Sequence, residues 1–289
     1  MTYFKLINND KIQKFIQIMK TIKLFNDYIS FIFNEDKLYI QGMDSSHICL
    51  YELNINNSWF DEYDYNGNDS KIIMSCYSSI INKILVLCKN NQGIVLSLDD
   101  ENYEKINIDI FDISLKQLET NNNENINEKS FEINCIDLES ELLTPDDMDY
   151  DIDLYISSKD LSNSFGEMVT FGDEIEMFCY SNLLKLKTTS SENIMTQKIS
   201  FDQLFKYEVI EDYKAYNKFQ LNYLNNITSL HKVFPKIKLS IQNDTPLCIY
   251  FEDINDKEQT DLYVRFYLAP KVDVSEYENI EQEFLSMIK

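Results

Sequence analysis

The chain has 289 residues, of which 44% are hydrophobic and 13% aromatic, and its formal net charge is −23. This composition supplies enough apolar side chains for buried cores and excludes an intrinsically disordered chain. The length suits two domains of about 100–150 residues each. No run of about 18 apolar residues is present, so we expect no membrane-spanning helix. The N-terminus lacks the basic start and apolar stretch of a signal peptide, and we therefore expect an intracellular, reducing location.

The first half of the chain predicts helices set among strands. Apolar residues recur at three- and four-residue spacing in 10–25 and in 77–89, which is typical of amphipathic helices. Alternation of apolar and polar residues predicts strands at 28–33, 37–41, 49–53 and 94–98. The polar turn 34–36 joins two of these strands as a hairpin.

After about residue 150 the same succession begins again. Helical spacing recurs in 158–170 and 219–232, and strands are predicted at 151–156, 175–180, 236–241 and 247–251. The repetition predicts an α+β fold of two similar domains, with helices on one side of a layer of sheets. We expect an N-terminal domain at 1–133, a connecting linker at 134–151, a C-terminal domain at 152–274 and an acidic tail at 275–289.

The acidic residues are unevenly distributed along the chain. Residues 11–26, 71–98 and 214–243 contain lysines but no Asp or Glu, although the chain carries 49 acidic residues. Each of these segments overlaps a predicted helix. A single such helix would be explained by an ordinary solvated face, but the joint pattern favours a positive surface separated from a negative one.

Metal chemistry and catalysis find little support in the residue pattern. The six cysteines lack C-x-x-C spacing and there are only two histidines, so we expect no metal site and no cofactor. The carboxylates form runs typical of a solvated face, and no catalytic residues are predicted. An enzyme that uses these carboxylates as acid–base groups or metal ligands is the alternative from another functional class.

Two segments carry a specific family resemblance. Residues 43–48 read M-D-S-S-H-I, and residues 266–272 read F-Y-L-A-P-K-V. In this combination the chain resembles the proliferating cell nuclear antigen (PCNA) family of DNA sliding clamps, with further similarity at 59–63 and 244–247. The resemblance implies a ring of three subunits, each of two clamp domains. Such a ring encircles duplex DNA and tethers DNA polymerase and other replication and repair proteins.

The resemblance also implies which lysines line the ring. On the matching helices, the residues expected to contact phosphates without sequence preference are Lys11, Lys14, Lys20, Lys83, Lys89, Lys159 and Lys232. Because a ring holds DNA by topology, weak contacts suffice and permit sliding. For any one of these residues, the alternative is a lysine that merely solubilises its helix.

A pocket for partner peptides is implied beside the linker. In the family, partners insert a short motif with a Gln and aromatic anchors, which is held by apolar burial and backbone pairing. The expected lining residues here are Met43, His47, Ile48, Leu50, Leu142, Leu143, Pro145, Pro246, Tyr267, Ala269, Pro270 and Val272. The alternative is that His47 is an ordinary loop residue and Tyr267 an ordinary core aromatic.

The family also implies how the ring closes and which partners act on it. A strand near 130–138 of one subunit would pair with a strand near 193–200 of the next. A homotrimer, a clamp loader and a nuclear or viral replication compartment are expected. The alternative is a diverged clamp acting as a heteromer or monomer in checkpoint, repair or late transcription. Ser181 stands where the family has its ubiquitin-accepting lysine, and the tail is expected to be frayed.

Overall fold

The computed structural model describes residues 1–67, 69–98, 104–113, 128–138, 142–143, 149–180, 182–211, 213–271 and 284. The chain forms two compact units. Unit 1 consists of Met1–Ser45, Tyr51–Leu143 and Glu252–Val264, and unit 2 of Ser46–Leu50, Thr144–Phe251 and Arg265–Lys289. Three strands contribute residues to both units: β4 (Cys49–Asn56), β17 (Leu247–Ile254) and β18 (Thr260–Leu268).

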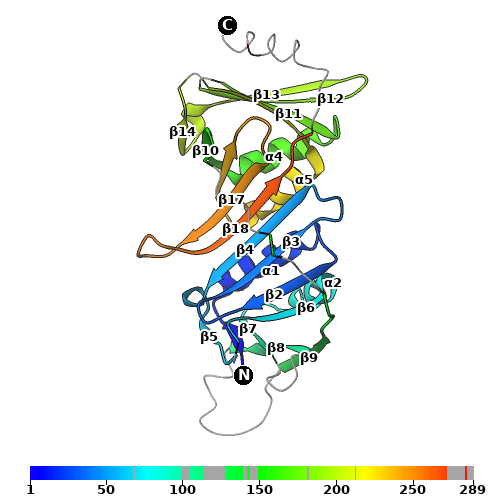
Figure 1. Cartoon of the computed structure of the whole chain (residues 1–289), viewed down its shortest axis with the longest axis vertical. Coiled ribbons are helices and arrows are strands. Elements are labelled where there is room, and N and C mark those ends of the chain that lie inside the picture. Colours follow the sequence, from blue (N-terminus) through cyan, green and yellow to red (C-terminus); the bar gives the residue numbers. More distant parts are fainter. Residues whose placement is uncertain are drawn as a thin grey trace. The chain divides into compact units, whose positions relative to one another are not determined.

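Unit 1 combines antiparallel sheets with the helices α1 (Asn9–Ile22) and α2 (Ser78–Leu85) (Figure 1). Its other elements are β1 (Tyr3–Leu6), β2 (Tyr28–Phe33), β3 (Lys37–Met43), the 3-10 turn η1 (Asn57–Trp59), β5 (Glu62–Asp64), β6 (Ile72–Tyr77), β7 (Gln92–Leu98), β8 (Lys105–Asp112) and β9 (Glu128–Asn134). Among the described residues, one sheet has the strand order β5-β1-β7-β8-β9. A second run of strands has the order β18-β4-β3-β2-β6.

The helices of unit 1 are held by a cap, a buried face and a cross-link. The side-chain oxygen of Asn8 accepts hydrogen bonds from the backbone N–H groups of Asp10 and Lys11, which caps α1. The amide of Asn82 in α2 donates to the Met19 carbonyl oxygen over 3.0 Å. The apolar stripe of α1 is buried and comprises Ile12, Phe15, Ile16, Met19 and Ile22. The opposite face of α1 is left for polar side chains.

Unit 2 repeats the plan with α4 (Ser158–Met168) and α5 (Leu221–Ile227), which continues into the 3-10 turn η3 (Thr228–Lys232). Its other elements are β10 (Ile152–Ser157), β11 (Glu174–Tyr180), β12 (Leu183–Thr189), β13 (Ile194–Ser200), the 3-10 turn η2 (Phe201–Gln203), β14 (Lys206–Val209), β15 (Lys214–Gln220) and β16 (Lys236–Ile241). In the part of unit 2 that is described, the strand orders are β13-β12-β11-β15 and β14-β10-β16-β17-β18.

Side-chain hydroxyl groups fix the helices of unit 2. Ser157 caps α4 by accepting from the Asp160 backbone N–H. The buried Ser158 hydroxyl donates to the Phe234 carbonyl oxygen, which ties the start of α4 to the segment after η3. Thr228 donates to the carbonyl oxygen of Leu224 over 2.8 Å where α5 tightens into η3.

The four helices predicted from apolar spacing are present, and each ends earlier than predicted. The α4 helix ends at Met168, before the predicted residue 170, and α5 ends at Ile227, from where the 3-10 turn η3 continues to Lys232. The pattern in 10–25 extends past the last residue of α1, and that in 77–89 extends past α2. Phe25 and Cys88 lie beyond these helix ends but are still buried, at 6% and 7% exposure. Apolar spacing reports burial, and here the turn after each helix is buried too. The α+β class is confirmed.

The structure leaves some expectations as they were. The predicted boundaries of the linker and tail stay a prediction, because 139–141, 144–148 and all of 275–289 except Phe284 fall outside the described residues. None of the described helices has the length and apolar character needed to cross a membrane. All six cysteines are free thiols, and all but Cys135 are buried.

Candidate functional site

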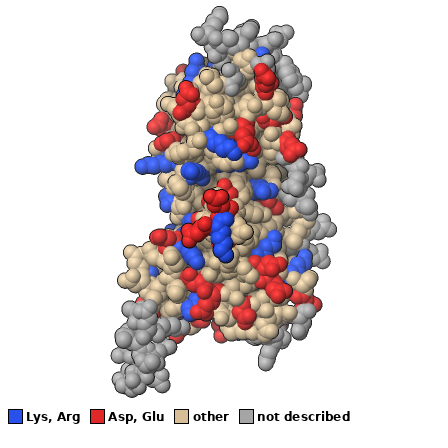
Figure 2. Space-filling view, turned by 90° about the vertical axis from the view of Figure 1, so that its left-hand side faces the viewer, with Lys and Arg blue, Asp and Glu red and all other residues tan. Residues whose placement is uncertain are grey.

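The lysines singled out by the sequence differ in exposure and in position. Lys89, predicted on a helix, lies beyond the end of α2, and Lys232 ends the 3-10 turn η3. Lys20, Lys83, Lys89, Lys159 and Lys232 are exposed. In the part of the chain that is described, none of their ammonium groups lies within salt-bridge distance of a carboxylate. Elsewhere lysines are interleaved with acids, as the face in Figure 2 shows. These five ammonium groups are accessible to an external anion.

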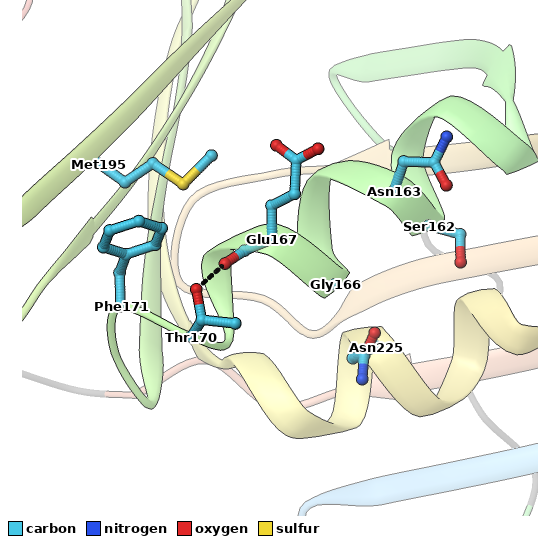
Figure 3. A pocket seen from close by; sticks show the side chains of 8 residues that line it. All are labelled: Ser162, Asn163, Gly166, Glu167, Thr170, Phe171, Met195 and Asn225. Carbon is cyan, nitrogen blue, oxygen red and sulfur yellow. Dashed lines mark hydrogen bonds between the residues drawn. The ribbon is translucent and has the colours of Figure 1, made fainter.

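A shallow open pocket lies beside α4 in unit 2. It is bounded by α4, by Asn225 of α5 and by Met195 of edge strand β13 (Figure 3). Phe171, just past the end of α4, is 40% exposed and lies next to Met195 at the mouth of the pocket. Glu167 directs its carboxylate away, while its carbonyl oxygen accepts from the Thr170 hydroxyl over 2.7 Å. The pocket therefore presents apolar surface, from Phe171 and Met195, beside the unpaired edge of β13.

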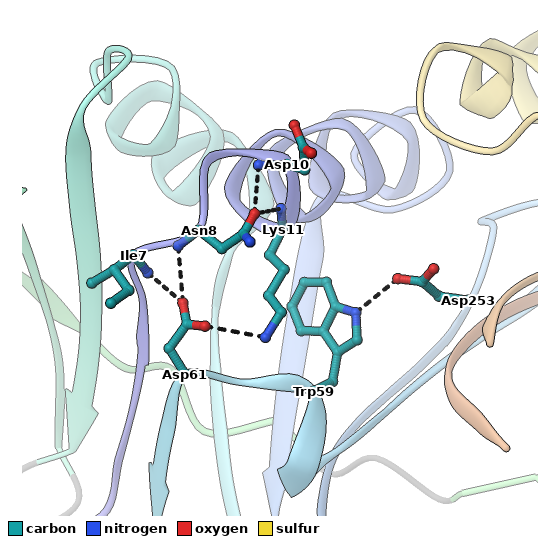
Figure 4. Close-up of polar contacts among 7 residues, drawn as sticks. All are labelled: Ile7, Asn8, Asp10, Lys11, Trp59, Asp61 and Asp253. Atoms are coloured by element: carbon teal, nitrogen blue, oxygen red, sulfur yellow. Dashed lines mark hydrogen bonds and ion pairs between the residues drawn. The ribbon is translucent and has the colours of Figure 1, made fainter. Parts of the chain in front are cut away.

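Lys11 is held by an acidic side chain at the start of α1. Its ammonium group lies 3.1 Å from one carboxylate oxygen of Asp61, and 5.8 Å from the centre of the Trp59 ring (Figure 4). The other Asp61 oxygen accepts from the backbone N–H groups of Ile7 and Asn8, over 2.6 and 3.0 Å. Burial alone would raise the pKa of Asp61. The two backbone N–H groups and Lys11 outweigh it, so that this pKa lies below its ordinary value.

Lys14 is held in the same way one turn further along α1. Its ammonium group lies 2.6 Å from the carboxylate of Asp253 in β17. The same Asp253 oxygen accepts from the Trp59 indole N–H over 2.9 Å. Lys11 and Lys14 thus form two neighbouring ion pairs on either side of the buried Trp59 ring. Residues 11–26 contain no acidic residue, so the local sequence could not predict these ion pairs. Their partners Asp61 and Asp253 lie far along the chain.

The residues expected to bind partner peptides are divided between the units. In unit 1, Leu142 and Leu143 are 38% and 45% exposed. The side chain of Gln41 fixes this segment. It donates to the Leu143 carbonyl oxygen over 2.6 Å and accepts from the Leu143 backbone N–H over 2.8 Å. Met43, at the end of β3, is partly exposed. Sequence reasoning missed Gln41, which holds two exposed leucines in place.

In unit 2, the backbone N–H of Ala269 donates to the Ile48 carbonyl oxygen over 2.9 Å, which joins the two motif segments. His47 before it is exposed and has the left-handed φ of 57°. The Tyr267 hydroxyl accepts from the Arg265 guanidinium over 2.9 Å. The remaining partly exposed residues of the set are Leu50, Pro246 and Pro270. Pro145 and Val272 lie outside the described residues, and assembly of the full set into one pocket stays a prediction.

No group of three or more His, Cys, Asp or Glu side chains within the described ranges could hold a metal ion. Burial raises the pKa of Cys76 and Cys179 to about 12 and that of Cys135 to about 11. These thiols are therefore protonated and unreactive near neutral pH. What the site offers is surface for binding: exposed ammonium groups, exposed leucines and strand edges.

Replacing Asp61 with Asn should destabilise unit 1 by roughly 1 kcal/mol at neutral pH, because a neutral amide accepts more weakly and loses the ion pair with Lys11. The depressed pKa means that the carboxylate contributes stability above its unfolded-state value near 3.8. This contribution is lost as the pH falls through the lower folded-state value. Urea unfolding of wild type and variant should therefore converge below about pH 4.

Asp256→Asn, in the exposed turn between β17 and β18, is the matched control and should leave stability unchanged at each pH. A stability difference between wild type and Asp61→Asn that stays constant from neutral pH down to about pH 3 would contradict the prediction.

Comparisons with known proteins agree on one family. The family model "Proliferating cell nuclear antigen, N-terminal domain" matches residues 5–142. The curated protein "Proliferating cell nuclear antigen 1" of Plasmodium falciparum is 23% identical over 278 residues, which cover 93% of this chain and 96% of that protein.

Solved structures share the fold of this chain. The crystal structure of PCNA from Entamoeba histolytica has a TM-score of 0.77 at 21% identity, covering 94% of this chain and 99% of its own. A chain of the PCNA2–PCNA3 complex from Sulfolobus tokodaii also reaches 0.77, at 20% identity, covering 94% of this chain and 100% of its own. Residues 5–142 thus match the N-terminal domain model of the proliferating cell nuclear antigen family, and nearly the whole chain has the fold of solved structures from that family.

Proposed function

We propose that copies of this chain assemble into a three-membered ring that encircles duplex DNA and tethers DNA polymerase and other replication and repair proteins. The observation that carries the proposal is the set of five exposed lysines that form no ion pair with the described carboxylates, in a clamp fold whose net charge is −23. An acidic protein can hold DNA only through a surface from which its carboxylates are excluded. Such a protein would work where replication takes place, in the nucleus or a viral replication compartment.

The DNA-facing lysines fall into two groups. Lys20 and Lys83 are exposed on α1 and α2, so a phosphate can approach them directly. Lys11 and Lys14 must first exchange Asp61 and Asp253 for a phosphate, and only the difference between the two interactions counts. Lys20 and Lys83 should therefore contribute more to binding, with Lys89, Lys159 and Lys232 acting alongside them. Weak contacts of this kind suit a ring that slides.

Ring closure would use two unpaired strand edges. In the described part of the chain, β9 and β13 are the end strands of their sheets, and each pairs with a single neighbour. Both have seven residues. Pairing of β9 in one copy with β13 in the next would satisfy both edges and close a ring by one repeated contact.

Apolar side chains flank both edges and complement each other. Beside β13, Ile194 is 66% exposed and the pocket of Figure 3 is open. On the partner side, Val86 and Leu87 follow α2 and are 51% and 43% exposed. The next residue, Cys88, is close enough to Lys129 of β9 for that charge to lower its pKa against the larger effect of burial. The residues after α2 therefore lie near β9. Val86 and Leu87 would enter the pocket of the next copy when β9 pairs with β13.

Replacing Lys20 and Lys83 together with Ala should weaken the binding of a short duplex about tenfold at low salt. The slope of log affinity against log salt should fall by about 1 for each lysine removed. Fluorescence anisotropy with a labelled duplex measures both. Lys11→Ala with Lys14→Ala should weaken binding less, because these two lysines already form ion pairs with Asp61 and Asp253.

The charge-matched control is Lys71→Ala with Lys257→Ala, two exposed lysines outside the helices. Equal weakening in this control and in the Lys20/Lys83 variant would show a diffuse charge effect and refute the assignment of the binding surface.

Phe171→Asp should convert a trimer into single chains, because a carboxylate cannot be buried in the pocket without a large desolvation cost. Light scattering after gel filtration gives the mass directly. Phe205→Asp is the control, since Phe205 is another exposed aromatic residue of unit 2, at 58% exposure. A wild-type chain that stays monomeric at micromolar concentration without a partner would instead support the heteromeric or monomeric alternative.

Leu142→Asp should abolish the binding of a peptide with a Gln and aromatic anchors while leaving the mass of the assembly unchanged. The exposed leucine would supply apolar contact area, and a carboxylate in its place would remain hydrated. Ile254→Asp, at a similarly exposed apolar residue of unit 1, serves as control. Calorimetric titration with the peptide measures the affinity of both variants. Unchanged binding by Leu142→Asp would show that the linker does not line the peptide pocket.

A further inference from the structure

Strand β11 carries aromatic residues on the polar face of its sheet. Side chains alternate along a strand, so Glu174, Glu176, Phe178 and Tyr180 share one face. Glu174 and Glu176 form ion pairs with lysines of the neighbouring strands β15 and β12. The other face is the core face, where Ile175, Met177 and Cys179 are at most 2% exposed. Phe178 nevertheless has 0% exposure, so another group must cover it on the polar side.

The neighbours of Phe178 form a defined surface. Directly opposite Phe178 stand Lys185 on β12 and Tyr216 on β15, and opposite Tyr180 stands Lys214. The Lys185 ammonium lies 5.5 Å from the Phe178 ring centre, and that of Lys214 lies 5.0 Å from the Tyr180 ring centre. The Tyr216 ring centre is 4.9 Å from that of Phe178. We call these five residues the aromatic–lysine surface.

Phe284, from the C-terminal segment, covers this surface. Its ring centre lies 5.7 Å from that of Phe178 and 6.1 Å from that of Tyr180, both edge-to-face. The Lys214 ammonium lies 5.7 Å from the Phe284 ring centre. Phe284 itself is only 6% exposed. Edge-to-face pairs and an ammonium over a ring are favourable beyond simple area burial. Part of the tail expected to be frayed is therefore packed.

The charge of the segment complements that of the surface. Residues 275–289 contain four glutamates and one lysine; Glu283 directly precedes Phe284, and Glu281 stands three residues before it. The surface presents Lys185 and Lys214, and Lys198 of β13 stands opposite Lys185. An acidic segment with an aromatic anchor is the chemistry that such a surface recognises.

The segment is attached at a suitable distance from the surface. The Lys271 backbone N–H donates to the Lys218 carbonyl oxygen over 2.7 Å, and the Lys271 ammonium pairs with Glu174, so the segment leaves from the same strands. Glu174 and Phe178 are about 14 Å apart along β11 at the usual rise per residue. The sequence places twelve residues, 272–283, between Lys271 and Phe284. A flexible chain of that length has a root-mean-square reach of about 19 Å. Because the distance to be spanned is similar to the reach of the connecting residues, the effective concentration of Phe284 at the aromatic–lysine surface is high.

We propose that the aromatic–lysine surface is a docking site for the chain's own acidic C-terminal segment, with Phe284 as its anchor. The docked Phe284 ring occupies the place on this surface that the aromatic anchor of another acidic ligand would take. Release of Phe284 would uncover the Phe178 ring and Lys185, the two members of the surface that are buried. The proposal does not depend on ring assembly or DNA binding.

The test compares the full-length chain with its Phe284→Ala and Leu285→Ala variants. Acylation of Lys185, followed by mass spectrometry, reports whether the surface is covered, with the exposed Lys257 as internal reference. Phe284→Ala should accelerate Lys185 acylation about tenfold, the scale set by burial of one aromatic side chain, and Leu285→Ala should match wild type. A fluorescein-labelled peptide of residues 276–289 should bind the Phe284→Ala chain about tenfold more tightly than wild type, which carries its own competitor.

Two further variants keep the result specific. A peptide with Ala in place of Phe284 should not bind, and Lys214→Glu in the Phe284→Ala chain should weaken binding of the unaltered peptide. Unchanged Lys185 acylation in Phe284→Ala would overturn the proposal. Equal binding of the two peptides would overturn it as well.

Discussion

A lysine ammonium attracts a phosphate fully only when no carboxylate already holds it. This competition determines how an acidic chain can bind DNA at all. On α1 the structure shows both outcomes within a few turns: Lys11 and Lys14 are paired with Asp61 and Asp253, while Lys20 is exposed. The paired lysines anchor the start of the helix against β17 and the segment around Asp61. The unpaired one is available to a ligand. One helix thus divides its lysines between folding and binding.

The sequence was sufficient for those features that local pattern determines. Apolar spacing located the four helices, and two short motifs predicted the family resemblance that the comparisons also find. It failed where a partner comes from a distant part of the chain. Nothing near Lys14 in the sequence indicates Asp253, and nothing in β11 shows that Phe178 has a cover on its polar face. The alternation along β11 predicted a strand and which side chains share a face. It could not predict which group packs against that face.

Unit 2 has two kinds of surface that need a partner: the unpaired edge of β13 and the aromatic rings of β11. Edge strand β13 presents unpaired backbone groups beside the exposed Ile194, and another copy of the chain would satisfy them. The aromatic rings of β11 are satisfied within the chain, by Phe284. An intramolecular cover works at any protein concentration, whereas an edge that waits for a second copy depends on concentration. The fold therefore leaves the edge of β13, the proposed assembly surface, exposed and covers the Phe178 ring within the chain.

Trp59 gives this arrangement an optical consequence. It is the single tryptophan of the chain, it is 3% exposed, and its indole N–H is bonded to the carboxylate that also holds Lys14. Lys11 lies over its ring. Intrinsic emission excited at the indole band therefore originates from one place, between the two ion pairs. A rearrangement of either pair alters the electric field across the chromophore, so the unlabelled protein carries its own spectroscopic probe of the helix start.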